Sequence, residues 1–225
     1  MRMRWDDLAF LHYRVEASQI RPLLPAGVEL ECHDGSAWIG VVPFKMENVA
    51  ARGLPVIPGT GRFLELNLRT YVRVNDRPGV WFFSLDASNR LAVRGARGGF
   101  CLPYFDAVMS VTGTSRFEYR SRRLHHGAIP GVFEGSYEGV GKSFVAESGS
   151  FEAWLTERYC LFAQDRSGRI TCGHVHHRPW SLRRCEVEMR RNTLGNLIGL
   201  SLGCQPDHSL FSKTLDVVAW WPEPA

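Results

Sequence analysis

The chain has 225 residues, of which 44% are apolar, and a formal net charge of +4. That length and apolar content are enough to bury one sizeable core, so we predict a single domain over residues 1–225. The first residues lack the pattern of a secretion signal, and no run of about 18 consecutive apolar residues occurs, which excludes a spanning helix. The composition therefore predicts a cytoplasmic protein without a membrane partner.

Cysteine and arginine usage narrows the choice of compartment and partner. The six cysteines occur without a C-x-x-C pair, a pattern typical of free thiols in a reducing compartment. Arginines cluster at 120–123 and 183–191, but Glu186 and Glu188 interrupt the second cluster. We therefore predict no nucleic-acid partner. The sequence leaves the oligomeric state open and is compatible with a homo-oligomer.

Turn-forming residues recur along the chain, and the segments between them are rich in Val, Phe, Trp, Tyr and Thr, which favours many short strands. Strands are predicted over 36–44, 63–74, 80–87, 105–112, 116–123, 169–176, 183–190 and 214–221. Short helices are predicted over 18–24, 150–162 and 193–200. The glycine-rich stretch 139–143 lacks the full spacing of a phosphate-binding loop and is predicted to be an ordinary loop. The expected fold is therefore mainly β (α+β).

Residues 63–74 alternate strictly along one predicted strand. Leucine, threonine and valine side chains, Leu66 and Leu68 among them, occupy one face, which we interpret as the core face. The other face presents a carboxylate, an amide, a guanidinium and a phenol in a row: Glu65, Asn67, Arg69 and Tyr71. Two interpretations are open. The row lines a polar pocket, or it forms a solvated face on which Glu65 and Arg69 pair along the strand.

Four segments carry a resemblance to a known family, namely 63–72, 78–89, 97–111 and 174–182. They are similar to the YqjF-like family of uncharacterised conserved bacterial proteins, which in turn resembles the acetoacetate decarboxylase superfamily. The resemblance implies a closed, cone-like antiparallel β-barrel with an interior pocket and a few short peripheral helices. In the decarboxylases an aromatic-x-Glu strand contributes a pocket carboxylate, which implies that Glu65 faces the pocket here.

The decarboxylase signature is incomplete in this sequence. In the decarboxylases a proline is followed by two lysines, one of which forms a Schiff base while its cationic neighbour lowers its pKa. Here Pro103 is followed by Tyr104 and Phe105, and the chain's lysines lie elsewhere. We therefore predict that the protein does not use Schiff-base chemistry and that Tyr104 contributes to ligand binding.

The histidine run His174, His176 and His177 places two imidazoles on one face of a predicted strand. A metal site needs a further ligand, and none stands out at a diagnostic spacing, so we predict no metal and no cofactor. The resemblance places His177 at a fixed corner of the fold, where it could act as an acid or base. Which of the three histidines faces the pocket stays open. Cys101 is a further candidate nucleophile, although free cysteines are more often buried apolar residues.

Two functions fit these observations. The first is a lyase-like enzyme acting on a small carboxylate or keto compound, in which Arg69 or Arg122 holds the anion and Glu65 or His177 moves a proton. The second is a non-catalytic binding protein for a small, partly apolar ligand. In both, the predicted binding residues are Asn67, Arg69, Tyr71, Tyr104 and Arg122.

Overall fold

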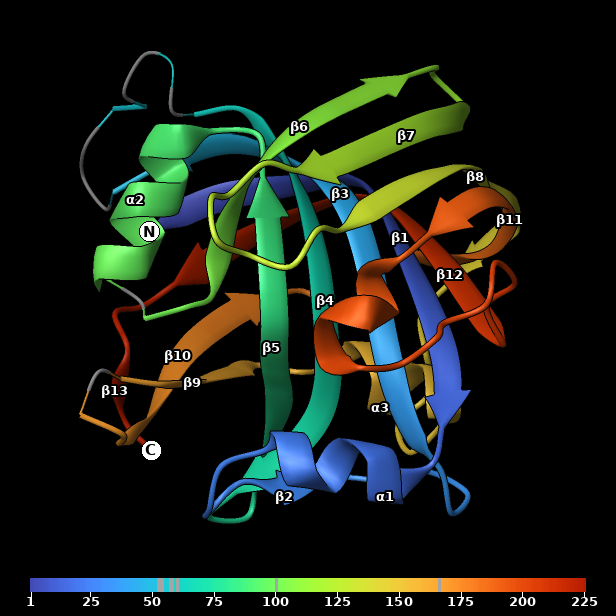
Figure 1. Ribbon diagram of the computed structural model, residues 1–225. Helices are drawn as coiled ribbons and strands as arrows, with labels where there is room; N and C mark the ends of the chain where they lie inside the picture. The colour runs from blue at the N-terminus through green and yellow to red at the C-terminus, as the bar shows by residue number, and fades with distance from the viewer. Residues whose placement is uncertain (52–54, 57–58, 60, 100, 166) are drawn as a thin grey trace.

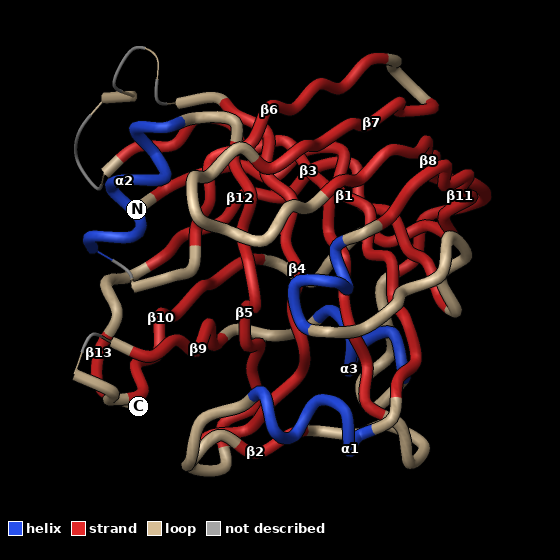
Figure 2. Tube along the Cα trace, in the orientation of Figure 1, coloured by secondary structure: helices blue, strands red, loops and turns tan. Residues whose placement is uncertain are grey.

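Strands dominate the structure, a computed structural model that describes residues 1–51, 55, 56, 59, 61–99, 101–165 and 167–225 (Figure 1). The described strands are β1 (Arg2–Val15), β2 (Glu29–Leu30), β3 (Ala37–Ala50), β4 (Phe63–Val74), β5 (Arg77–Ala87), β6 (Tyr104–Thr112), β7 (Arg116–Arg123), β8 (Val132–Phe144), β9 (Cys160–Gln164), β10 (Ile170–His177), β11 (Leu182–Asn192), β12 (His208–Ala219) and β13 (Glu223–Pro224). The described helices are α1 (Ala17–Ile20), α2 (Arg90–Gly99) and α3 (Phe151–Thr156), with 3-10 turns η1 (Arg21–Leu23) and η2 (Leu194–Ile198). The helices lie at the periphery of the strands (Figure 2), so the expectation of a mainly β fold with few short helices is confirmed.

The strands form one sheet in the order β13-β10-β9-β5-β6-β7-β8-β11-β12-β1-β3-β4-β2, and β10 also pairs with β12 and β5 with β4. Strand β5 runs parallel to β6 and to β9, so the expected antiparallel arrangement is wrong at β5. Parallel neighbours need a crossover connection, and between β5 and β6 the chain forms helix α2.

The observed helices differ from the predicted ones in length and number. The segment 150–162 is helical only as far as Thr156, although Ser150 caps the helix by accepting a hydrogen bond from the Ala153 N–H at 3.2 Å. The last residues of the predicted helix, 160–162, instead form the start of β9, which pairs with β10. Phe162 is buried in this strand. Helix α2 was not predicted because its glycines, such as Gly95, have low helix propensity.

Each predicted strand overlaps an observed one, but the predicted loop at 139–143 is wrong, because these residues belong to β8. The glycines there suggested a turn. In the structure Gly139 makes room for a neighbouring ring, since a Cβ added to it would lie 2.3 Å from the Phe211 side chain. The glycine permits close packing between strands, which a turn rule does not anticipate.

Both faces of β4 are buried, each against a different group of apolar side chains. Leu66 and Leu68 pack into one core with Phe117 and Tyr119. Tyr71, on the opposite face, belongs to a second core. The face that carries Glu65 is therefore interior, and the interpretation of a solvated face is wrong. Within the described part of the chain, no helix has the length and apolar character needed to cross a membrane.

Candidate functional site

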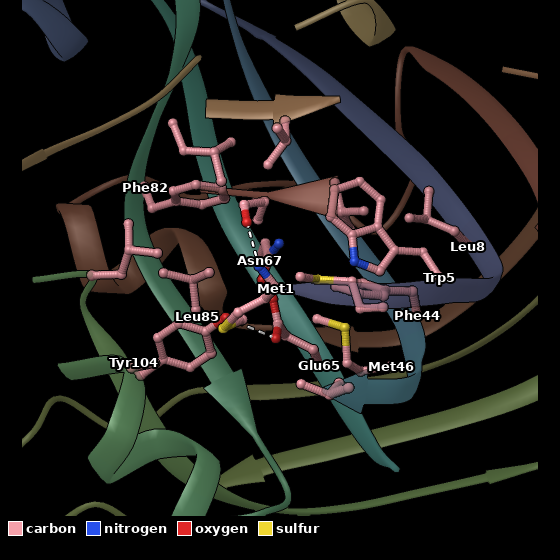
Figure 3. Close-up of a pocket in the computed structure, with 18 of the residues that line it drawn as sticks. Met1, Trp5, Leu8, Phe44, Met46, Glu65, Asn67, Phe82, Leu85 and Tyr104 are labelled. Atoms are coloured by element: carbon pink, nitrogen blue, oxygen red, sulfur yellow. Dashed lines mark hydrogen bonds between the residues drawn. The ribbon is translucent and has the colours of Figure 1, made fainter. Parts of the chain in front are cut away.

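A cavity of about 390 Å³ opens against the interior face of β4. Its walls come from strands β1, β3, β4, β5, β6, β9, β10 and β12 and from helices α2 and α3 (Figure 3). Most of the lining is apolar and includes Trp5, Leu8, Phe10, Phe44, Met46, Phe82, Leu85, Leu102, Trp180 and Trp221. The polar lining is small and consists of Glu65, Asn67, Arg69, Tyr104, Thr156, Arg158 and His177. An apolar enclosure with a few convergent polar groups is typical of a small-molecule site.

Glu65 is the carboxylate of this cavity, and its side chain is only 2% exposed. The Tyr104 hydroxyl donates a hydrogen bond to Glu65 Oε2 at 3.0 Å (Figure 3), and the Tyr119 hydroxyl holds the Glu65 carbonyl oxygen at 2.8 Å. Among the described residues no lysine or arginine forms an ion pair with it. Burial therefore raises the pKa of Glu65 to about 8, although hydrogen bonds from Tyr104 and Asn67 partly oppose the shift.

Arg69 lies two positions beyond Asn67 on the same face of β4, and both side chains carry unsatisfied polar atoms. Asn67 Oδ1 and Arg69 Nε and Nη2 are buried without a hydrogen-bond partner among the described residues. Gly40 stands opposite Arg69 in the β3–β4 pairing, and a Cβ there would lie 3.3 Å from Arg69 Cγ. The glycine therefore leaves the guanidinium room at the cavity wall, with donors to offer to an anion.

Arg158 is a cavity residue that the sequence did not single out. Its Nε donates to the Trp154 carbonyl oxygen at 2.6 Å, and its guanidinium forms an ion pair with Glu31. The guanidinium also lies 5.3 Å from the Tyr71 ring centroid. Glu31 is far from Arg158 in sequence, so no local pattern could have placed this second cation beside the cavity.

His177 is the histidine of the run that lines the cavity. Its Nδ1 lies 2.8 Å from the Arg178 carbonyl oxygen, which can only accept, so Nδ1 carries the proton and Nε2 is left as an acceptor. Burial lowers the pKa of His177 below its usual range. Its ring packs beside Trp5, Tyr159 and Trp180.

Two predicted binding residues do not line the cavity. Tyr71 lies beneath the wall, where its hydroxyl and His12 Nε2 are 2.6 Å apart. Arg122 is exposed on the outer side of β7, and strand alternation instead turns Arg123 inward. Arg123 forms a buried ion pair with Asp86, its Nε lying 3.0 Å from Oδ1. Neither Arg122 nor Arg123 lines the cavity, and which of the two faces inward depends on how β7 pairs in the sheet.

The cavity wall formed by the described residues contains no lysine. Lys45 and Lys213 both bind the carboxylate of Asp7, at 2.6 Å and 2.5 Å, and Lys142 is exposed on β8. Cys101 is also absent from that wall. The position after Pro103, where the decarboxylases have a lysine, is occupied by the phenol that contacts Glu65.

Comparison with known proteins connects this architecture to one family and one fold. A family model described as an uncharacterized conserved protein, DUF2071, matches residues 2–216. The uncharacterized protein YqjF of Bacillus subtilis (strain 168) is 42% identical over 221 residues, which cover 98% of this chain and 90% of YqjF.

Solved structures share the fold at low sequence identity. The enduracididine biosynthesis enzyme MppR complexed with pyruvate matches with a TM-score of 0.64 and 15% identity, over 98% of this chain and 89% of MppR. Acetoacetate decarboxylase from Legionella pneumophila matches with a TM-score of 0.66 and 12% identity, over 100% of this chain and 87% of that chain. At these identities the likeness establishes the fold, and function must be argued from the cavity itself.

Proposed function

This chain belongs to the DUF2071 family of uncharacterized conserved proteins, and on that premise we propose that it is a lyase-like enzyme acting on a small carboxylate or keto compound. One observation carries the proposal. A carboxyl group without a cationic partner among the described residues stands in an apolar cavity, where Tyr104 holds it in place. Groups with such perturbed proton affinity are concentrated at catalytic sites.

Binding of the substrate is assigned to the guanidinium groups. Arg69 offers buried N–H groups that have no acceptor among the described residues, and an arginine fork matches the two oxygens of a carboxylate. Arg158 adds positive charge to the same lining, although its ion pair with Glu31 already uses part of its capacity to bind an anion. The apolar walls would enclose the remainder of the substrate.

Proton transfer is assigned to Glu65 and His177, whose environments push them toward opposite roles. A carboxyl group with a pKa of about 8 is mainly protonated at neutral pH, so Glu65 can donate a proton. His177 is neutral under the same conditions, since burial lowers its pKa, and its Nε2 can accept one. An acid and a base with such separated proton affinities are what proton transfer next to a carbonyl requires.

Two features of the fold belong to the same proposal. Strands from both ends of the chain belong to the same sheet, where β12 is the neighbour of β1, which supports one domain over residues 1–225. The additional pairing of β4 with β5 connects strands from distant places in that order, which supports a sheet that closes around the cavity, as the family resemblance implies.

The test starts with a thermal-shift screen of small 2-oxo and 3-oxo carboxylates, beginning with pyruvate because MppR has been solved with it. A compound that binds only the folded state raises its stability. Each compound that does so is then followed by NMR in D₂O. We expect the protein to accelerate exchange of the hydrogens next to the carbonyl.

Glu65→Gln is the decisive variant because it keeps the shape of the side chain and removes the transferable proton. It should bind the same compound but exchange hydrogens at the uncatalysed rate. Glu118→Gln is the matched control, since Glu118 pairs with Arg190 outside the cavity, and it should behave like the wild type. Acceleration that survives Glu65→Gln would refute the assignment of Glu65.

The second candidate function is a non-catalytic binding protein for a small, partly apolar ligand. The observation that favours it is the predominance of aromatic and aliphatic side chains on the walls. Stabilisation by a ligand without accelerated exchange or turnover would support this candidate and overturn the enzyme.

A further inference from the structure

A second group of reactive side chains lies on the β9–β10 hairpin, on the face that points away from the cavity. Leu161 and Val175 from these strands line the cavity. Because side chains alternate along a strand, Cys160, Cys172 and His174 project from the opposite face. Cys160 and Cys172 are buried, and His174 is half-buried.

The register of the hairpin brings the three side chains together. Cys160 is directly opposite His174 in the antiparallel pairing, and the Cys160 Sγ and His174 Nδ1 atoms are 4.0 Å apart. Cys172 lies two residues before His174 on the same face. The two Sγ atoms and one imidazole nitrogen all lie within 4.8 Å of one another.

Glu223 completes the arrangement from a third strand. Strand β13 pairs with β10 and places Glu223 opposite Cys172. The carboxylate Oε1 lies 3.0 Å from His174 Nε2, so Nε2–H donates to the carboxylate and Nδ1 keeps its lone pair toward the cysteines. A carboxylate behind a histidine fixes the tautomer and orientation that metal-binding histidines use.

We propose that Cys160, Cys172 and His174 form a binding site for a thiophilic divalent cation of the Zn²⁺ class, through two Sγ atoms and Nδ1. Two thiolates and a neutral imidazole are a donor set that zinc prefers. Binding releases one proton from each thiol, so the two thiolates neutralise the charge of the ion. Three protein ligands leave the fourth tetrahedral position to water or an added ligand.

The two cysteines lie in a small apolar cluster. Val28, Val74 and Phe162 belong to the same cluster as Cys160 and Cys172. Arg77 is a neighbouring cation, and the negative charge of the two thiolates offsets it in the occupied site.

A disulfide between Cys160 and Cys172 is the competing use of these thiols. The two residues are diagonal across the hairpin, and diagonal neighbours are separated by about 7–8 Å between Cα atoms. A disulfide usually needs a Cα separation below about 7 Å. A zinc ion, with bonds of about 2.3 Å to each sulfur, holds the sulfurs further apart than the roughly 2.05 Å of a disulfide.

The proposed site departs from the expectation of no metal. The sequence shows no further ligand at a diagnostic spacing because the ligands are distributed over two strands and are joined only by strand pairing. His176, which the histidine run also offered, is exposed, and His177 lines the cavity instead.

The first experiment titrates reduced, metal-free full-length protein with Co²⁺, followed by competition with Zn²⁺. We expect one ion per chain, thiolate-to-cobalt charge transfer in the near ultraviolet, the visible bands of tetrahedral Co²⁺, and loss of both on adding Zn²⁺. These spectra identify thiolate ligands in the wild-type protein without any substitution. Absence of thiolate charge transfer, or a thiol pair that oxidises to an intramolecular disulfide and binds no ion after reduction, would overturn the proposal.

Variants then locate the site. His174→Gln and the double variant Cys160→Ser with Cys172→Ser should each abolish stoichiometric binding, with circular dichroism confirming the fold. Glu223→Gln should weaken the affinity about 10-fold, the scale of an outer carboxylate. The matched controls are Cys32→Ser, Cys204→Ser and His176→Gln, which alter exposed residues. Loss of binding in the controls, or retention of it in His174→Gln, would place the ion elsewhere and refute this assignment.

Discussion

Glu65 has the same side chain as every other glutamate of the chain, and its surroundings give it different chemistry. It is buried among apolar residues and receives its hydrogen bond from Tyr104, an uncharged partner. Glu118, by contrast, is partly exposed and bound by Arg190, which lowers the pKa of Glu118. The contrast can be measured through the pH dependence of stability.

We predict that Glu65 makes the protein less stable as the pH rises from about 4.5 to about 8. Over this range the folded protein keeps the proton that the unfolded chain has lost, so the free energy of unfolding falls, by at most about 1.4 kcal/mol per pH unit. Urea denaturation at several pH values should show that Glu65→Gln removes this slope, while Glu118→Gln keeps it. Parallel curves for wild type and Glu65→Gln would contradict the raised pKa.

The positions of Arg69 and Arg122 lead to a second prediction. Arg69 faces the cavity with N–H groups that no residue in the described part of the chain satisfies, and Arg122 is exposed outside the cavity. Arg69→Ala should weaken binding of a carboxylate ligand by about 1.5 to 3 kcal/mol, the scale of a hydrogen bond to a charged group, and Arg122→Ala should leave it unchanged. Isothermal titration with a compound from the oxo-acid screen measures both. Equal losses in the two variants would mean that the carboxylate is not held at Arg69.

Individual strands explain why the site was only partly predictable from the sequence. The alternation along β4 correctly grouped Glu65, Asn67 and Arg69 on one face, because a strand has a fixed two-residue period. Whether that face met water or a cavity depended on the other strands that surround it. Arg158 and the inward turn of Arg123 depend on partners in other strands or loops, Glu31 and Asp86, which no local pattern identifies.

The leucine face of β4 should respond to truncation as a core does. Leu68 is fully buried, so Leu68→Ala should lower the free energy of unfolding by about 2 to 5 kcal/mol through lost burial and the cavity left behind. Val108, on β6, is 56% exposed, and Val108→Ala should cost less than about 1 kcal/mol. Chemical denaturation compares the two. A small loss for Leu68→Ala would show that this face can repack or is less buried than described.

The whole molecule keeps the fold of the acetoacetate decarboxylases while sharing 12% identity with the example from Legionella pneumophila. The mainly β class could be predicted because turn spacing and strand composition are distributed along the entire chain, whereas the decarboxylase-like fold was expected from the family resemblance. The parallel neighbours of β5 were missed because helix α2, which connects β5 to β6, was not predicted. Strand β8 was missed because the close packing of Gly139 against Phe211 exists only in the folded molecule.

The distribution of lysines over the molecule makes a prediction about mechanism. Lys45 and Lys213 are held by Asp7, and Lys142 is exposed on β8. Incubation with pyruvate or acetoacetate and borohydride should therefore leave the intact mass unchanged, since an imine requires a lysine that reaches the substrate. An acetoacetate decarboxylase treated in parallel supplies the positive control. A stoichiometric adduct on any of the three lysines would restore the imine mechanism.

The tryptophan side chains of the cavity wall provide an optical signal for ligand binding. Trp5 and Trp180 stack with their centroids 5.9 Å apart, and Trp221 contributes to the same lining. The emission of an indole depends on the polarity of its surroundings, and a ligand that displaces water from the cavity changes that polarity for these rings together. Occupancy can thus be followed through the intrinsic fluorescence of the unlabelled protein, even for a compound that has no colour of its own.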